Sequence, residues 1–100
     1  MSPRLALSKE QIAEFCRRNH IRKLSLFGSI LREDFTPESD VDMLVEFEEG
    51  ARVSLFDFVG MEIELSETLG RKVDLNTAQD LSRFFRRKVL EEAEVQYVAA

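Results

Sequence analysis

Residues 40–47 have the sequence DVDMLVEF. From Val41 onward it is rich in branched and aromatic residues, which predicts a strand over residues 41–47. Two aspartates stand at its start, although Asp is depleted in strands and is almost never buried without a partner. Asp40 and Asp42 are two positions apart, so both side chains leave the same face of an extended chain. The stretch therefore predicts a strand that brings two carboxylates to one face of a sheet.

The residues upstream of this strand predict a helix and a first strand. Ser8 and Gln11 have the spacing of a helix capping box, and apolar residues then recur at helical spacing. A strand-like run follows and ends at Gly28-Ser29. The expected elements are a helix over residues 9–19, a strand over residues 21–27, a short helical turn over residues 30–33 and a turn over residues 36–39.

The residues downstream predict a longer helix, a third strand and a last helix. Ser54 is placed to cap the longer helix, and Gly70 stands where a glycine would end it. The side expected to be buried carries Leu55, Phe58, Val59, Leu65 and Leu69. After it we expect a strand over residues 71–76, a helix over residues 82–93 with Phe85, Val89 and Ala93 inward, and a short strand over residues 95–98.

The order α-β-α-β-α-β-α predicts an α/β (α+β) fold, a small mixed sheet with flanking helices. A chain of 100 residues is long enough for one domain, so we expect a single domain over residues 1–100. No apolar run has the length of a membrane span, and the N-terminus lacks the layout of a secretory signal. The lone cysteine, Cys16, excludes an internal disulfide. These features predict a cytoplasmic protein.

The charge of the chain limits its expected partners. Hydrophobic residues make up 44% and charged residues 33%, which argues against disorder, and the formal net charge is −5. This negative charge argues against direct nucleic-acid binding by the whole domain. Basic residues nevertheless cluster at Arg17-Arg18, at Arg22-Lys23 and within residues 83–88. These clusters are either solvated helix faces or a surface for an acidic partner, and the sequence leaves formation of homo- or hetero-oligomers open.

A third aspartate, Asp74, interrupts the later apolar run Val73-Asp74-Leu75. If its strand neighbours the strand of Asp40 and Asp42, all three carboxylates can lie together. Clustered carboxylates repel one another unless cations intervene, and Mg²⁺ takes one or two carboxylates plus substrate phosphates. Each aspartate alone also has a structural explanation. Asp40 can belong to a turn, Asp42 can face solvent on an edge strand, and Asp74 can do the same or pair with Arg71 or Lys72.

Gly28-Ser29, ten further residues and then Asp40-Val41-Asp42 resemble the G-S-x10-D-x-D signature of the polymerase-beta-type nucleotidyltransferase superfamily. Further positions resemble its minimal nucleotidyltransferases, the short prokaryotic proteins usually paired with a HEPN-domain partner, as in the MntA-type antitoxins. They include Phe27, Arg32, Asp34, Val45, residues 55–57, residues 69–75 and the pattern Phe85…Val89-Leu90…Ala93. The resemblance covers about residues 24–98. The chain departs from many relatives at Glu33, where they have Gly, and at Met43, where they have Leu.

The resemblance implies a two-metal transfer of a nucleoside monophosphate. It implies that Asp40, Asp42 and Asp74 are catalytic and hold two Mg²⁺ (or Mn²⁺) ions. It also implies that Gly28 and Ser29 bind the phosphates of ATP, and that Arg32 braces this loop or pairs with Asp34. The expected protein is an antitoxin that transfers AMP from ATP to a hydroxyl of a HEPN toxin.

Two other functions remain open from the sequence. The first is a catalytically idle, nucleotide-binding antitoxin that masks its partner sterically. The second is transfer to a small molecule, which a chain of this size makes less attractive because it offers no second lobe to close over the substrate. Other chemistry has little support, since His20 is expected to end the first helix and no Walker-type phosphate loop is present.

Overall fold

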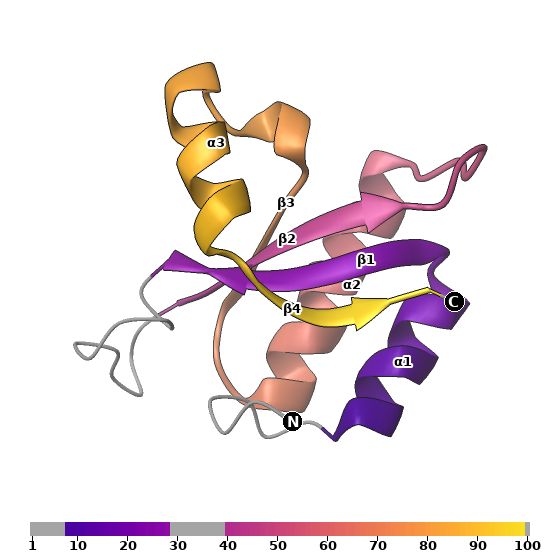
Figure 1. Ribbon diagram of the computed structural model, residues 1–100. Helices are drawn as coiled ribbons and strands as arrows, with labels where there is room; N and C mark the ends of the chain where they lie inside the picture. Colours follow the sequence, from indigo (N-terminus) through magenta and orange to yellow (C-terminus); the bar gives the residue numbers. More distant parts are fainter. Residues whose placement is uncertain (1–7, 29–39, 100) are drawn as a thin grey trace.

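The computed structural model describes residues 8–28 and 40–99, and Figure 1 shows how their elements are arranged. In chain order these are α1 (Lys9–Arg18), β1 (Ile21–Phe27), β2 (Val41–Phe47), α2 (Leu55–Leu69), β3 (Val73–Asn76), the 3-10 turn η2 (Ala78–Asp80), α3 (Arg83–Glu92) and β4 (Glu94–Val98). The expected turns over residues 30–33 and 36–39 lie outside the described residues. None of the described helices is long and apolar enough to cross a membrane.

The four strands form one mixed sheet in the order β3-β2-β1-β4. Strand β1 runs antiparallel to both β2 and β4, whereas β2 and β3 are parallel. A parallel pair needs a crossover connection, and α2 supplies it. The predicted α+β fold with a small mixed sheet and flanking helices is therefore confirmed, and β3 lies next to β2 as the clustering of the three aspartates requires.

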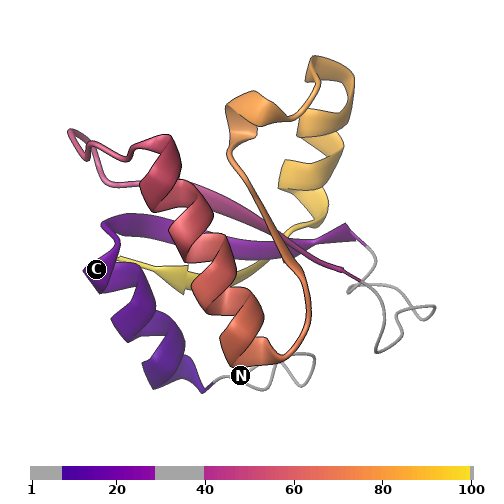
Figure 2. The ribbon, with the colours of Figure 1, turned by 180° about the vertical axis from the view of Figure 1, so that it is seen from behind.

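Helices α1 and α2 cover one face of the sheet (Figure 2). Alternate strand residues point into this layer, and they meet Ile12, Phe15 and Cys16 from α1 and Met61 and Leu65 from α2. The strand members of this cluster are Ile21, Leu24, Leu26, Val41, Met43, Val45, Val73 and Leu75. Because side chains alternate across a strand, Asp42 and Asp74 leave the opposite face. The hydrophobic core thus fixes which face of the sheet the aspartates occupy.

A smaller cluster covers part of that opposite face. It contains Phe27, Leu44, Leu81 and Val89, with Ala93 packed against it. The prediction that Val89 and Ala93 face inward is confirmed, but the prediction for Phe85 is wrong, because Phe85 is 48% exposed. In Figure 1 the first turn of α3 rises away from the sheet, and the buried apolar contact there comes from Leu81 instead.

The 3-10 turn η2, which the sequence did not predict, is held against α3 by one arginine. The Arg86 guanidinium donates to the carbonyl oxygens of Ala78 at 2.6 Å and of Leu81 at 3.1 Å. Other basic residues pair with acidic neighbours, Arg18 with Glu64, Arg22 with Glu46 and Arg87 with Glu91. These pairs favour the interpretation of the basic clusters as solvated faces.

The buried side of α2 differs from the prediction. Leu65 is buried and Phe58 and Leu69 are partly buried, as expected, but Leu55 is 77% and Val59 41% exposed. Met61, which was not expected inside, is buried. The helix carries apolar residues on more than one side, so periodicity alone could not decide which side packs on the sheet.

The predicted capping residues of α1 and α2 are confirmed. Ser8 and Gln11 form a capping box at α1. Ser54 forms another at α2, where its hydroxyl accepts from the Asp57 amide at 3.1 Å. Gly70 follows α2 with φ 72°, a left-handed conformation that favours glycine. These ends fix where the crossover helix begins and where the chain turns back into β3.

Strand β3 is an edge strand, and α2 satisfies its outward amides. The Val73 amide donates to the Ser66 hydroxyl at 2.9 Å, and the Leu75 amide donates to Glu62 Oε2 at 2.8 Å. Glu62 and Ser66 are four residues apart, so both project from one side of the helix. The amides that flank Asp74 are therefore tied to α2, and the position of Asp74 depends on that helix.

We expect Glu62→Ala to lower the free energy of unfolding by about 1–2 kcal/mol, because the Leu75 amide loses a charged acceptor. Glu62→Gln, which keeps an acceptor oxygen, should lose less. Glu67→Ala serves as the control, since Glu67 is exposed on the same helix. Urea unfolding of the three variants measures the difference, and equal losses for Glu62→Ala and Glu67→Ala would contradict the bonded role of Glu62.

Candidate active site

The register of β2 and β3 brings the three aspartates to one end of the sheet. Asp42 and Asp74 are direct partners across the parallel pair, and Val41 and Val73 are partners one position earlier. Asp40 precedes β2, and its side chain leaves the same face as that of Asp42. The prediction that these carboxylates share one face of adjacent strands is therefore confirmed. That face is the one that α1 and α2 leave uncovered.

Gly28 lies directly beside Asp42. Its predecessor Phe27 is the cross-strand partner of Asp42 in the antiparallel pair of β1 and β2. Gly28 has φ 79°, and a Cβ atom placed on it would lie 2.5 Å from Asp42 Oδ2. The left-handed backbone conformation favours glycine, and a side chain at this position would also displace the Asp42 carboxylate. Ser29, Arg32 and Asp34 lie outside the described residues, so their predicted roles stay predictions.

The alternative explanations of the aspartates can now be compared with the structure. Asp42 is not on an edge strand, because β2 lies between β3 and β1. Asp74 does lie on the edge strand, and it also has the predicted lysine neighbour. The Lys72 ammonium is 4.0 Å from Asp74 Oδ1 and 3.9 Å from Asp40 Oδ2. These are loose ion pairs between exposed groups, so they do not explain why three carboxylates gather here.

The carboxylate oxygens of Asp40, Asp42 and Asp74 are chemically suited to bind a divalent cation. Three carboxylates offer the hard oxygen ligands that Mg²⁺ prefers, and the ammonium of Lys72 already takes a cationic position between two of them. In the part of the chain that the structure describes, no three acidic, histidine or cysteine side chains are grouped closely enough to hold a metal ion by themselves. Magnesium usually completes its shell with water and substrate phosphates, so the carboxylates fit a metal that arrives with a nucleotide.

Neither Cys16 nor His20 can serve this site. Cys16 is buried in the core under α1, and burial raises the pKa of its thiol to about 12, although Arg17 lowers it slightly. His20 follows the C-cap residue Asn19 with φ 57°, as expected for a residue at the end of a helix. It precedes β1, whereas Gly28 follows β1. A thiol nucleophile and a histidine base are therefore excluded here.

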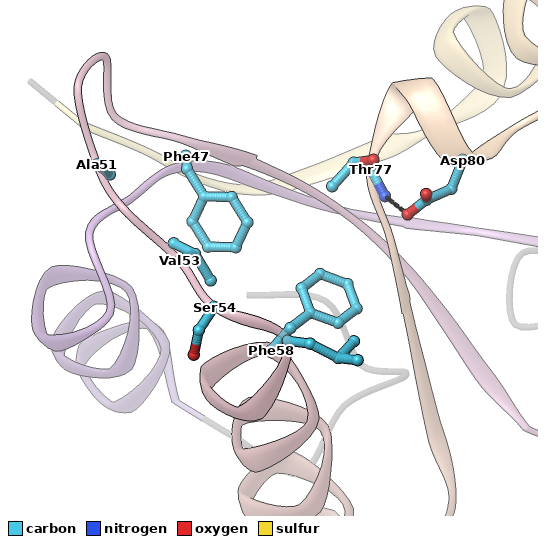
Figure 3. A pocket seen from close by; sticks show the side chains of 8 residues that line it. Phe47, Ala51, Val53, Ser54, Phe58, Thr77 and Asp80 are labelled. Atoms are coloured by element: carbon cyan, nitrogen blue, oxygen red, sulfur yellow. Dashed lines mark hydrogen bonds between the residues drawn. The ribbon is translucent and has the colours of Figure 1, made fainter.

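A separate cavity of about 510 Å³ lies at the other end of β2 (Figure 3). It is lined by Phe47, Phe58 and residues around the start of α2, with Thr77 and Asp80 on its far side. The two phenylalanine rings pack edge to face with centroids 6.4 Å apart. Phe47 is five residues along the strand from Asp42, which is about 16 Å in an extended strand. The cavity is therefore not the site of the aspartates.

Two features of the site are not predicted from the sequence. Lys72 is expected there only as one of two partners for Asp74, and the close contact of Gly28 with Asp42 is not expected at all. The position of Lys72 can nevertheless be inferred from the sequence, since Lys72 lies two residues before Asp74 in an extended segment and so shares its face. The contact of Gly28 with Asp42 depends on strand pairing, which no local pattern specifies.

Comparisons with known proteins agree with this geometry. Residues 9–96 match the family model of the nucleotidyltransferase domain. The protein adenylyltransferase MntA of Thermococcus cleftensis is 36% identical over 88 residues, which cover 88% of this chain and 84% of that protein. A solved structure of a "putative minimal nucleotidyltransferase" is 34% identical, covers 85% of each chain and has a TM-score of 0.70.

A more distant match is a complex of a tri-AMPylated HEPN toxin of Shewanella oneidensis with an MNT antitoxin. It has a TM-score of 0.65 at 19% identity and covers 91% of this chain and 70% of the matched chain, a likeness that shows the fold alone. The family match covers most of the chain, and the sequence relative is similar over nearly its whole length. The protein is therefore a nucleotidyltransferase, and it belongs to the minimal nucleotidyltransferases of the nucleotidyltransferase domain family.

Proposed function

We propose that this nucleotidyltransferase is an antitoxin that transfers AMP from ATP to a hydroxyl of a HEPN-domain toxin. The proposal rests on the direct pairing of Asp42 with Asp74 beside Gly28, whose left-handed backbone favours glycine. The name of the T. cleftensis relative supports a protein acceptor. The AMPylated HEPN toxin in the S. oneidensis complex supports both the partner and the nucleotide. Cytoplasmic ATP would serve as the substrate.

Asp40, Asp42 and Asp74 would hold Mg²⁺ or Mn²⁺. Two such ions supply charge neutralisation for the triphosphate and lower the pKa of the attacking hydroxyl. The family resemblance assigns Asp74 to the acceptor side, where it would take the proton of the hydroxyl. The acceptor oxygen forms a bond to the α-phosphorus, and the bond from that phosphorus to the pyrophosphate oxygen breaks.

Gly28 and Ser29 would bind the β- and γ-phosphates, and Arg32 would brace their loop. A missing side chain at Gly28 lets phosphate oxygens approach the backbone closely, beside the carboxylate of Asp42. Three carboxylates would repel a triphosphate that came alone. The proposed site therefore needs a cation for nucleotide binding as well as for transfer.

The alternative function is an antitoxin that binds nucleotide and masks its toxin sterically without transfer. All three aspartates and Gly28-Ser29 are present in the chain, which favours catalysis. The two functions differ in whether inhibition of the toxin needs these side chains and outlasts the complex.

Mg²⁺ or Mn²⁺ alone should raise the melting temperature only slightly, and ATP with the metal should raise it clearly. The reason is that few protein ligands face the metal, and that ligand binding stabilises the folded state by mass action. Differential scanning fluorimetry with metal, ATP and both together measures the effect. An unchanged melting temperature with every triphosphate and metal at millimolar concentration would argue against the site.

Asp42→Asn should abolish transfer and leave the fold intact or slightly more stable. The amide removes a charge directly opposite Asp74, and like charges on directly paired residues are destabilising. It also removes a carboxylate ligand at the point where charge develops. Glu49→Gln, in the turn that follows the far end of β2, is the matched control and should keep full activity. Transfer of radiolabel from ATP and the urea midpoint are measured together. An unfolded Asp42→Asn protein would instead indicate a structural role.

Incubation with the HEPN partner, ATP and Mg²⁺ should add one or more adenylate masses to the partner. An added phosphodiester charge near a ribonuclease site repels RNA phosphates, so inhibition should persist after the antitoxin is removed. Intact mass spectrometry and a ribonuclease assay measure the two effects. The double variant Asp40→Ala, Asp42→Ala should bind the partner without inhibiting it. An unmodified partner that the double variant inhibits as well as the wild type would support steric masking and refute transfer.

A further inference from the structure

Lys72 completes a two-by-two arrangement of charges at the start of β2 and β3. Asp42 faces Asp74 across the parallel pair, and two positions earlier in each segment stand Asp40 and Lys72. The backbone fixes this arrangement, because the Val41 amide donates to the Lys72 carbonyl oxygen at 2.9 Å. The Lys72 side chain therefore leaves the same face as the three carboxylates.

The ammonium of Lys72 lies between carboxylates from two different segments. Its Nζ atom is 3.9 Å from Asp40 Oδ2 and 4.0 Å from Asp74 Oδ1. It therefore brings a positive charge to two of the three carboxylates. At this distance a unit charge measurably changes the affinity of a site for a cation, even where solvent makes the dielectric constant high.

The side chain can also leave without disturbing the fold. It is 69% exposed, and both of its ion pairs are at the limit of contact distance. Exposed pairs of this kind contribute little to stability, and the lysine stem is flexible. The ammonium is thus a weakly held counter-ion rather than a structural bridge.

We propose that the ammonium of Lys72 weakens metal binding at this site until a nucleotide is present. The ammonium neutralises Asp40 and Asp74 in the metal-free protein, competes with a divalent cation for them, and repels that cation once it is bound. A triphosphate removes this opposition, because its oxygens add metal ligands and give the ammonium other anions to contact. This inference rests on the proposed metal and nucleotide site.

The test is Mn²⁺ binding, followed by the paramagnetic resonance signal of the free ion. Wild type, Lys72→Met, Lys72→Arg and the control Lys9→Met are titrated without nucleotide and with saturating α,β-methylene-ATP, which cannot be cleaved at the bond that transfer breaks. Lys9 is exposed at the start of α1, on the other face of the sheet, so its loss matches the change in net charge. All four proteins are first compared by urea unfolding.

Without nucleotide, Lys72→Met should bind Mn²⁺ about three- to tenfold more tightly than wild type. Lys72→Arg and Lys9→Met should remain close to wild type. The factor by which the nucleotide strengthens Mn²⁺ binding should fall by a similar amount in Lys72→Met. A purely structural role would instead weaken binding in this variant.

Equal or weaker Mn²⁺ binding by Lys72→Met without nucleotide would overturn the inference and leave the proposed function standing. An equal gain in Lys9→Met would also overturn it, because net charge alone would then explain the effect. Absence of Mn²⁺ binding by wild type even with the nucleotide would overturn the proposed site and this inference together.

Discussion

The parallel pairing of β2 with β3 fixes which side chains of these strands enter the core and which lie on the open face. It sets Asp42 opposite Asp74, and it points Val41, Met43, Val73 and Leu75 into the core on the other side. A slip of one residue in the register would turn Asp74 into the core and Val73 onto the open face. Such a register is unfavourable, because burial of a carboxylate without a partner costs much free energy. The hydrophobic core and the acidic site therefore specify the same register.

The crossover helix α2 makes this pairing possible and then secures it. Its capping box and its terminal glycine set its length, and its side chains Glu62 and Ser66 bond the outward amides of β3. A short edge strand of this kind would otherwise present unpaired amides to solvent. Placement of Asp74 by a helix is more exact than placement by a loop, which suits a residue that must lie opposite Asp42.

The sequence predicted most of the fold because most of its signals are local. These signals include the spacing of Asp40 and Asp42, the capping box formed by Ser8 and Gln11, and the glycine at position 70. Each depends on neighbours in the chain, and the structure confirms the feature that each one predicts. The predicted burial of Leu55, Val59 and Phe85 was wrong because it depended on which side of a helix meets the sheet. The contact of Gly28 with Asp42 and the bond from Leu75 to Glu62 join distant segments, so only tertiary structure reveals them.

We propose that Asp42 and Asp74, brought together from two strands, hold the metal that accompanies the nucleotide. Anomalous diffraction from crystals grown with Mn²⁺ and α,β-methylene-ATP would locate that metal. We expect manganese peaks about 2.0–2.3 Å from carboxylate oxygens of Asp42 and Asp74, with the phosphates beside Gly28. Bound nucleotide without manganese at these carboxylates, or nucleotide seated in the distant cavity of Phe47 and Phe58, would contradict this proposal.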